Sequence, residues 1–302
     1  MRTGWYQIGF LRDFEEDITP VAINKKPYMV IRTEEEYALY EATCPHRGAN
    51  LAKGGKLIAE GMVCPFHGCV VGLVCPSDEG YQVNRHPLLV VDGLVFTKND
   101  NAPGCGFQEF MEHLSSTHII IPGFTMEVTV EPELVIENAF DQMHFMTVHL
   151  IKNEPKFEIL SRTDNAFSVK GTFVIPPSVW QTEEGEPLSD SAAISVPYEA
   201  TAFSPYTVVS RLQGRNPYYI ITSARLKDGA VSAIYLSIGI PNDRFDENEI
   251  GLYKYLIDQS YYGLEKDKVI WENLDTDAVT RYRPEERSVI GFRQFCKLFP
   301  ST

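Results

Sequence analysis

The stretch from residue 44 to residue 68 decides the fold prediction. It begins with CPHRG at residues 44–48 and ends with CPFHG at residues 64–68. The 17 residues 47–63 lie between the first histidine and the second cysteine. Each short segment supplies one thiol and one imidazole beside proline and glycine, residues that are typical of tight turns. Two such loops at this spacing predict a metal centre with mixed sulfur and nitrogen ligands.

The distribution of the ligands distinguishes this centre from a structural zinc site. A zinc finger usually groups two cysteines on one loop and two histidines on a helix, whereas each loop here carries one of each. The pattern suits a 2Fe-2S cluster in which Cys44 and Cys64 hold one iron, while His46 and His67 hold the other. Two neutral nitrogens make such a cluster less negative and raise its reduction potential. A structural zinc ion, or buried cysteines unrelated to surface histidines, are the alternatives.

Both loops together resemble the Rieske motif, Cys-x-His followed by Cys-x-x-His. The form Cys-Pro-His-Arg-Gly is similar to the Rieske oxygenase branch rather than to the respiratory branch, which adds a disulfide beside the cluster. Cys69 departs from the pattern, because the oxygenases commonly carry Trp after the second His-Gly. Cys69 and Cys75 either form a shielding disulfide or remain free, small core residues.

A second candidate centre lies in residues 134–149. Residues 134–148 contain no Pro or Gly and predict a helix. His144 and His149 are five positions apart, which is about 140° on a regular helix, so they share a metal only if the helix bulges or ends between them. Alone, the pair also suits ordinary core or surface histidines. Glu-Asn followed by Asp-x-x-His-Phe-x-x-x-His resembles the mononuclear-iron motif of Rieske oxygenases, closest to the ketosteroid-hydroxylase-like branch.

A site with two histidines needs an anionic third ligand. The long predicted helix at residues 246–274 and the residues after it offer Asp258, Glu265, Asp267, Glu272, Asp275 and Asp277. Helical phase favours Asp267, because Leu256, Leu264, Ile270, Trp271 and Leu274 all fall within about 60° of it. A carboxylate inside an apolar stripe needs a cation nearby, which is either a metal or a Lys or Arg partner. The segment Asp-x-x-Ile-Trp at residues 267–271 also resembles the carboxylate-ligand segment of the same branch.

Asp141 precedes His144 by about one helical turn. The resemblance implies that Asp141 bridges a histidine of the neighbouring subunit's cluster to a histidine at the mononuclear iron. It therefore implies a head-to-tail ring, a homotrimer, which is a closed heterologous assembly. The alternative is a capping or salt-bridging aspartate.

Outside the motifs, the pattern predicts an α+β protein. Short apolar runs broken by Gly, Pro and Asn predict a β-rich unit up to Phe96, and the polar residues 98–106 mark a boundary. Segments that alternate apolar and polar residues predict an antiparallel meander at residues 163–175, 206–212, 218–226 and 230–240. We therefore expect two domains. The resemblance implies a Rieske 2Fe-2S domain at residues 1–105 and a helix-grip (START-like) catalytic domain at residues 106–302, made of an antiparallel sheet and helices.

The resemblance implies a terminal oxygenase that uses O2 and a mononuclear Fe(II) to oxidise a small organic substrate. Its ketosteroid-like character favours monooxygenation (hydroxylation, or O- or N-dealkylation) over cis-dihydroxylation. A separate flavin and/or iron–sulfur reductase must deliver electrons from NAD(P)H, because the chain has no Gly-x-Gly-x-x-Gly segment between a strand and a helix. Aromatic and proline-rich residues 176–180 and 202–206 are candidate walls for a mainly apolar substrate. An electron-transfer Rieske protein and a ligand-binding module are the rival interpretations.

Composition limits the partners. The 302 residues carry a formal charge of −14, and 44% of them are hydrophobic. This length suits about two domains and a sizeable core. The negative balance argues against nucleic acid and anionic membrane surfaces as partners. We expect a cytoplasmic protein, because no apolar segment predicts an anchor or an export signal.

Overall fold

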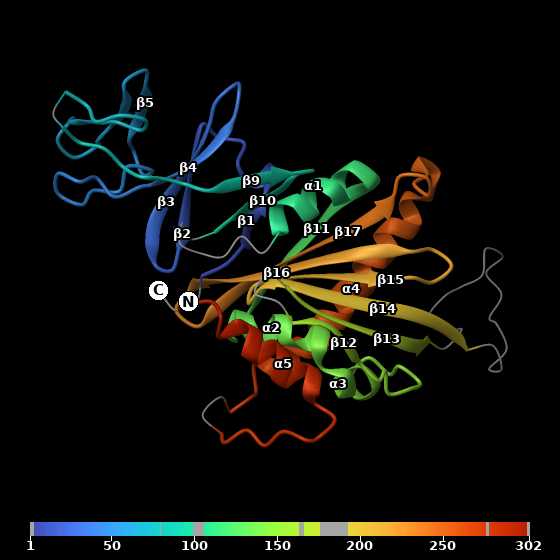
Figure 1. Cartoon of the computed structure of the whole chain (residues 1–302). Coiled ribbons are helices and arrows are strands. Elements are labelled where there is room, and N and C mark those ends of the chain that lie inside the picture. The colour runs from blue at the N-terminus through green and yellow to red at the C-terminus, as the bar shows by residue number, and fades with distance from the viewer. Residues whose placement is uncertain are drawn as a thin grey trace.

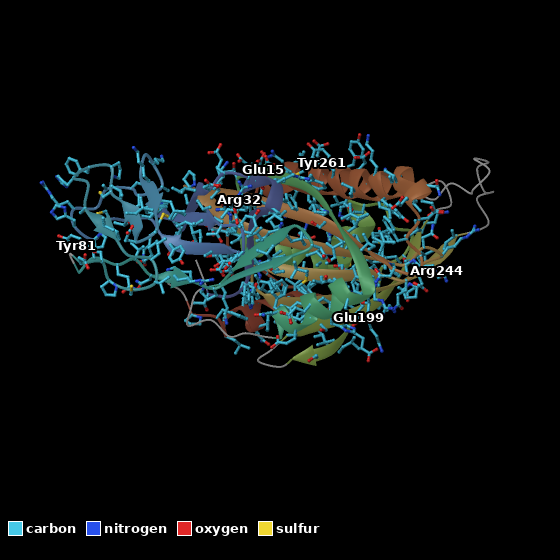
Figure 2. The ribbon with its side chains drawn as sticks, turned by 90° about the horizontal axis from the view of Figure 1, so that it is seen from above. Glu15, Arg32, Tyr81, Glu199, Arg244 and Tyr261 are labelled. Atoms are coloured by element: carbon cyan, nitrogen blue, oxygen red, sulfur yellow. The ribbon has the colours of Figure 1, made fainter. Side chains whose placement is uncertain are left out.

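A computed structural model describes residues 3–78, 80–98, 106–162, 166–175, 193–275 and 278–300. The N-terminal part consists of small antiparallel sheets, and the C-terminal part is built on one large antiparallel sheet with helices against it (Figure 1). Tyr81 lies at one end of the molecule and Arg244 lies at the other, beyond the large sheet (Figure 2). The predicted α+β class is confirmed.

Among the residues that the structure describes, three small sheets make up the N-terminal part. One sheet contains β2 (Ile18–Ile23), β3 (Lys26–Arg32), β4 (Tyr37–Glu41) and β8 (Arg85–His86). The second contains β5 (Lys56–Ile58), β6 (Gly61–Val63) and β7 (Val70–Val71). The third contains β1 (Tyr6–Phe10), β10 (Leu94–Thr97) and β9 (Leu88–Val91), and the short helix η1 (Leu11–Asp13) follows β1.

Local sequence explains the hairpins in this part. Asp92 and Gly93 join β9 to β10 with φ of 44° and 80°, as a two-residue hairpin turn with positive φ at both positions requires. Asn24 and Lys25 join β2 to β3 in the same left-handed region, with φ of 51° and 64°. Such turns match the twist of the flanking strands, so the strands pair without splaying.

The large sheet has seven antiparallel strands in the order β11-β17-β16-β15-β14-β13-β12. Their bounds are β11 His118–Val128, β12 Glu158–Arg162, β13 Phe167–Ile175, β14 Ile194–Ser204, β15 Thr207–Leu212, β16 Tyr218–Asp228 and β17 Val231–Pro241. The helices of this part are α1 Phe107–Thr117, α2 Pro132–Glu137, η2 Asn138–Phe140, α3 Gln142–Thr147, η4 Glu247–Glu249, α4 Ile250–Trp271 and α5 Arg287–Cys296.

Alternation along the strands gives the sheet two apolar faces. On β17, Leu236 and Ile238 face a core that includes residues of α2, α4 and α5, whereas Tyr235 faces a second core with α1 and β10. Successive side chains of a strand point to opposite faces, so a strand with no polar face indicates cover on both sides. The helices α2, α4 and α5 cover one face, and α1 with the β1-β10-β9 sheet covers the other.

Buried hydrogen bonds fasten strand β1 to the large sheet. Ser204 and Thr207 both donate their hydroxyls to the carbonyl of Trp5, and the Tyr235 hydroxyl donates to the carbonyl of Ile8. Arg225 is buried and donates to Ala22 of β2. The N-terminal part is therefore attached through its own backbone. The predicted boundary between residues 105 and 106 adjoins residues 99–105, which lie outside the described residues.

One predicted wall segment lies in this contact instead of in a cavity. Phe203 packs against Phe107 and Phe110 of α1, and Tyr206 meets Tyr6 of β1 edge to face. The prediction that residues 202–206 line the substrate site is wrong, because these two rings belong to the face of the sheet that the N-terminal part covers. The other predicted segment, residues 176–180, lies outside the described residues.

Candidate metal centres

The two Cys-and-His loops have the same construction. Gly48 donates its N–H to the carbonyl of Cys44 at 2.8 Å, and Gly68 donates to the carbonyl of Cys64 at 3.0 Å. Both glycines have positive φ, 75° and 73°, which a residue with a side chain rarely adopts. The sequence therefore closes two equivalent turns, each of which carries a buried cysteine at its start.

The histidines of these loops lie outside the cysteines. His46 and His67 are exposed, and their ring centroids are 4.8 Å apart. Cys44 and Cys64 are buried. Two inner thiols and two adjacent outer imidazoles are the donor set that a 2Fe-2S cluster with mixed ligands requires, so these residues fit such a cluster.

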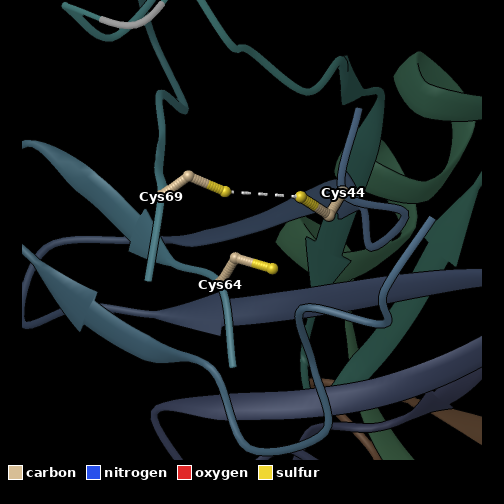
Figure 3. A group of neighbouring side chains, drawn as sticks. All are labelled: Cys44, Cys64 and Cys69. Carbon is tan, nitrogen blue, oxygen red and sulfur yellow. Dashed lines mark hydrogen bonds between the residues drawn. The ribbon is translucent and has the colours of Figure 1, made fainter. Parts of the chain in front are cut away.

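A third buried thiol, that of Cys69, lies in the same group, with its Sγ atom 3.9 Å from that of Cys44. Figure 3 shows the side chains of Cys44, Cys64 and Cys69 together. Burial raises the pKa of Cys69 to about 12. Burial also acts on Cys64, but hydrogen bonds, chiefly from the backbone of Phe66, outweigh it and hold the pKa of that thiol below its ordinary value. Cys64 is thus the better thiolate donor, and Cys69 is a thiol that keeps its proton.

Cys69 and Cys75 are both free cysteines, the first buried and the second exposed. Of the two alternatives for this pair, the structure has the free thiols rather than the shielding disulfide.

The segment with the two candidate histidines is a broken helix. Helix α2 and the short helix η2 end before Asp141, whose extended backbone (φ −89°, ψ 96°) separates them from α3. The Asp141 carboxylate accepts hydrogen bonds from the N–H groups of Met143 and His144, and so caps α3. The prediction of one helix over residues 134–148 is wrong at this point, because an aspartate side chain competes with the backbone for these N–H groups.

The break and the early end of α3 bring the histidines together. Helix α3 stops at Thr147, and Nε2 of His149 lies 3.1 Å from Nε2 of His144. The predicted condition, a helix that ends between the two residues, is met. His144 donates from Nδ1 to the carbonyl of Asp141 at 2.7 Å, which leaves the lone pair of Nε2 directed at the shared space. Burial, followed by the neighbouring His149, lowers the pKa of His144, so its imidazole is neutral at neutral pH, as a metal ligand must be.

Helix α4 places Asp267 against this pair. The Asp267 side chain is only 4% exposed, and its Oδ1 lies 3.4 Å from Nε2 of His149. No hydrogen-bond donor satisfies this buried oxygen among the described residues. The candidate ligand atoms of His144, His149 and Asp267 all lie within 4.8 Å of one another. A buried carboxylate oxygen without a donor, beside two imidazole nitrogens, fits a divalent cation held by a 2-His-1-carboxylate set.

The helical phase of Asp267 is largely as predicted. Leu256 and Trp271 are buried with it, whereas Ile270 and Leu274 are 45% and 47% exposed. Of the other carboxylates considered, the described ones lie outside this group of three, and Asp277 lies outside the described residues.

A cavity of about 330 Å³ adjoins the triad, by which we mean His144, His149 and Asp267. Its walls include Phe145 on α3, Phe173 and Tyr198 on the sheet, and Leu256 on α4. The sequence analysis named Leu256 only as part of the apolar stripe around Asp267, and it assigned none of these residues to a cavity wall. Strand alternation carries the signal that could have found them, because Phe173 and Tyr198 are inward positions of the helix-covered face.

A second depression of about 690 Å³ lies on the other side of the triad. It is lined by Asp141, Trp271, Leu274 and Arg293, and it shares His144, Asp267 and Asn138 with the first cavity. The triad therefore separates an apolar cavity from a more polar depression.

An ion pair lies in the wall of this depression. Arg293 of α5 binds both carboxylate oxygens of Glu137, one of them at 2.8 Å. Burial raises the pKa of Glu137, although Arg293 acts in the opposite direction. Helix α5 was not predicted from the sequence, and its residues Phe292, Arg293 and Cys296 line this depression.

The profile of the Rieske [2Fe-2S] domain matches residues 4–73, which include both loops with their cysteines and histidines. The N-terminal part is a Rieske domain. A Rieske domain implies a 2Fe-2S cluster, so the cofactor expected from the loop spacing is confirmed. A cholesterol 7-desaturase of Xenopus laevis is 52% identical over 40 residues, a match that spans 13% of this chain and 9% of that protein.

Similarity to solved structures extends from the Rieske domain over the whole fold. Dicamba monooxygenase bound to dicamba has a TM-score of 0.72 at 16% identity, over 98% of this chain and 97% of that chain. NdmB of Pseudomonas putida CBB5 has a TM-score of 0.68 at 16% identity, and NdmA with caffeine has 0.69 at 15%; each match covers 97% of this chain and 89% of the other. At these identities the likeness establishes the fold. Dicamba monooxygenase has also been solved with a non-heme iron.

Among the described residues, no helix has the length and apolar character needed to cross a bilayer.

Proposed function

We propose that this protein is the terminal component of a Rieske-type oxygenase that monooxygenates a mainly apolar small organic substrate. The observation that carries the proposal is the buried Oδ1 of Asp267, which lacks a hydrogen-bond donor and faces two imidazoles beside an apolar cavity. A pure electron carrier does not require such a group, and a simple binding module does not require a Rieske domain on the same chain.

In this proposal, Cys44, Cys64, His46 and His67 hold the 2Fe-2S cluster. His144, His149 and Asp267 hold one Fe(II). When bound, the Fe(II) activates O2 with electrons that reach it from the cluster, and the outcome is hydroxylation or O- or N-dealkylation.

The chain's own residues orient and shield this site. The hydrogen bond from His144 Nδ1 to the carbonyl of Asp141 fixes the tautomer and the ring orientation. The anionic Asp267 offsets positive charge that would otherwise be buried. Phe145, Phe173 and Tyr198 form a wall from which water is excluded, which protects a substrate next to the triad from side reactions.

Electron delivery is proposed to occur between subunits, in a homotrimeric head-to-tail ring. The loops that follow β4 and β6 and the helix α3 lie in different parts of the chain, well separated in Figure 1. The loops present Phe66, which is 59% exposed, with the Arg47 guanidinium 5.7 Å from the centre of its ring. The depression beside α3 presents Asp141 and the half-exposed Leu274. A cationic and aromatic tip complements an acidic and apolar depression, so Asp141 lies where the loops of a neighbouring copy can dock.

The electron donor in this proposal is a separate flavin and/or iron–sulfur reductase that oxidises NAD(P)H. The chain carries no dinucleotide-binding Gly-x-Gly-x-x-Gly segment of its own. A cytoplasmic location belongs to the same proposal.

Iron analysis and isotope labelling test the function. The oxygenase should contain about three irons per chain, two in the cluster and one at the triad, whereas an electron carrier or a binding module contains only the cluster. With a surrogate reductase, NADH and candidate substrate pools under ¹⁸O2, one labelled oxygen should enter a product. Two irons per chain together with unlabelled products would refute the proposal.

A further inference from the structure

The chemistry of the cavity beside the triad points to the charge of its ligand. At about 330 Å³ it lies at the small end of ligand pockets. The ring of Phe173 lies 4.7 Å from that of Phe145 and 4.5 Å from that of Tyr198, and Phe145 lies 5.7 Å from the ring of His149. These contacts make an aromatic wall that leads directly to the triad. A charged group pressed against this wall, out of reach of the triad, loses its hydration without compensation.

Cations are scarce around this cavity. Among the described lining residues outside the triad, the ionisable groups are Lys266 and the tyrosines Tyr198, Tyr218, Tyr255 and Tyr262. Burial holds the pKa values of Tyr198 and Tyr218 well above the ordinary range, so both are neutral hydroxyl groups. Lys266 is exposed on α4, so its ammonium keeps its hydration at the edge of the cavity.

The internal segments outside the described residues add no cation, because residue 79 and residues 99–105, 163–165, 176–192 and 276–277 contain no Lys, Arg or His. Residues 176–192 instead contain four carboxylates. None of these segments can therefore supply a cation for a carboxylate at the aromatic wall.

Neutral hydrogen-bonding groups are present in place of cations. The Tyr198 hydroxyl donates to the carbonyl of Ala139 and lies 3.1 Å from Oγ of Ser210. Ser210 is buried and lines the cavity, so this pair offers one polar contact within apolar walls. Such a pair suits a hydroxyl, ether or carbonyl group of a ligand.

We propose that the site selects an uncharged ring compound and discriminates against carboxylates of the same shape. The inference rests on the proposed oxygenase function, because it names the substrate class of that site. It differs from what the structural similarity alone suggests, since relatives with this fold were solved with ligands as different as dicamba and caffeine.

A matched pair of probes tests the charge preference. We suggest measuring the affinities of the iron-loaded protein for 4-methoxybenzamide and 4-methoxybenzoate at pH 7 without O2, from the perturbation of the EPR signal of an added nitric oxide probe and from thermal protection. The amide should bind at least about tenfold more tightly, a difference of about 1.4 kcal/mol. Equal affinity, or tighter binding of the benzoate, overturns the inference.

Two further measurements decide the outcome if the first pair of probes does not behave as expected. If the benzoate binds and Lys266→Gln removes that binding, Lys266 acts as an anion receptor and the inference fails. If neither small probe binds, 6-methoxynaphthalene-2-carboxamide and the matching carboxylate repeat the comparison in a larger frame, and failure of both pairs also overturns it. These outcomes are separate from the iron count and the ¹⁸O label, which test the oxygenase function itself.

Discussion

The Rieske loops and the triad assemble their candidate ligands in opposite ways. The loops take all four ligands from two turns, each closed by its own hydrogen bond from a glycine N–H. The triad takes one candidate ligand from α3, one from the residues just after it and one from α4, and all of the strands β12–β17 lie between α3 and α4 in the chain. The first centre depends on local turns, whereas the second depends on tertiary packing. The two centres should therefore fail in different ways when single residues are changed.

The largest effect should come from a cluster ligand. Cys64→Ala should remove the cluster, and with it turnover, whereas Cys69→Ala should keep a Rieske-type EPR signal because Cys69 is a neighbouring protonated thiol. Iron content and EPR of the two variants measure this difference. Loss of the cluster in Cys69→Ala would mean that the third thiol, and not a histidine, is a ligand.

Asp267→Ala should lose the triad iron and turnover, and leave the cluster signal intact. Loss of groups that only support metal ligands typically costs 10–100-fold in activity, so loss of a ligand should cost more than about 100-fold. Asp258→Ala on the same helix is the matched control and should retain activity. A fully active Asp267→Ala variant would rule out the triad.

A smaller effect is expected at Asp141, which connects the two centres in the proposed ring. Asp141→Asn retains a good N-cap for α3 but removes the charge, so both metals should stay while the rate of product formation falls by about 10–100-fold. Asp141→Ala also removes the cap, and should cost a further amount of about 0.5–2 kcal/mol in stability. An unchanged rate of product formation in Asp141→Asn would count against the electron path.

The smallest effect concerns the ion pair behind the triad, which has no counterpart in the loops. Because burial raises the pKa of Glu137, the folded chain holds this proton more tightly than the unfolded chain does. The contribution of Glu137 to stability therefore declines as the pH rises above its ordinary pKa of 4.5. Between that pH and neutrality, the thermal midpoint of the unchanged protein should therefore fall relative to the midpoint of Glu137→Gln. Parallel midpoints would contradict the pKa direction, and the exposed Glu131→Gln serves as the control.

The same contrast explains what the sequence could predict. The loops were predictable because their ligands and turn residues lie within one short stretch. Asp267 was predictable from helical phase, since a carboxylate in an apolar stripe needs a partner whatever the surrounding fold. Its assignment with His144 and His149 as metal ligands, like that of the cluster residues, remains a prediction that the proposed variants test.

Other features depend on competition between alternative local and long-range contacts, which the sequence does not resolve. Asp141 breaks the predicted helix without Pro or Gly, because its side chain captures two N–H groups, and the sequence does not say whether an internal aspartate will cap or face solvent. Residues 202–206 were expected to line the substrate site, but Phe203 lies on the other face of the sheet, and a shift of one residue in a strand exchanges its faces. Helix α5 and its ion pair depend on contacts distant in the chain, which composition and periodicity do not report.

The buried contacts between β1 and the large sheet have a consequence for assembly. Ser204, Thr207 and Arg225 hold the Rieske domain at a fixed angle to the C-terminal part. In the proposed ring, the angle between the Rieske domain and the C-terminal part sets the curvature at which each copy meets the next. It therefore sets how many copies close the ring. The size of the oligomer is then encoded at residues buried in the interior of a single subunit.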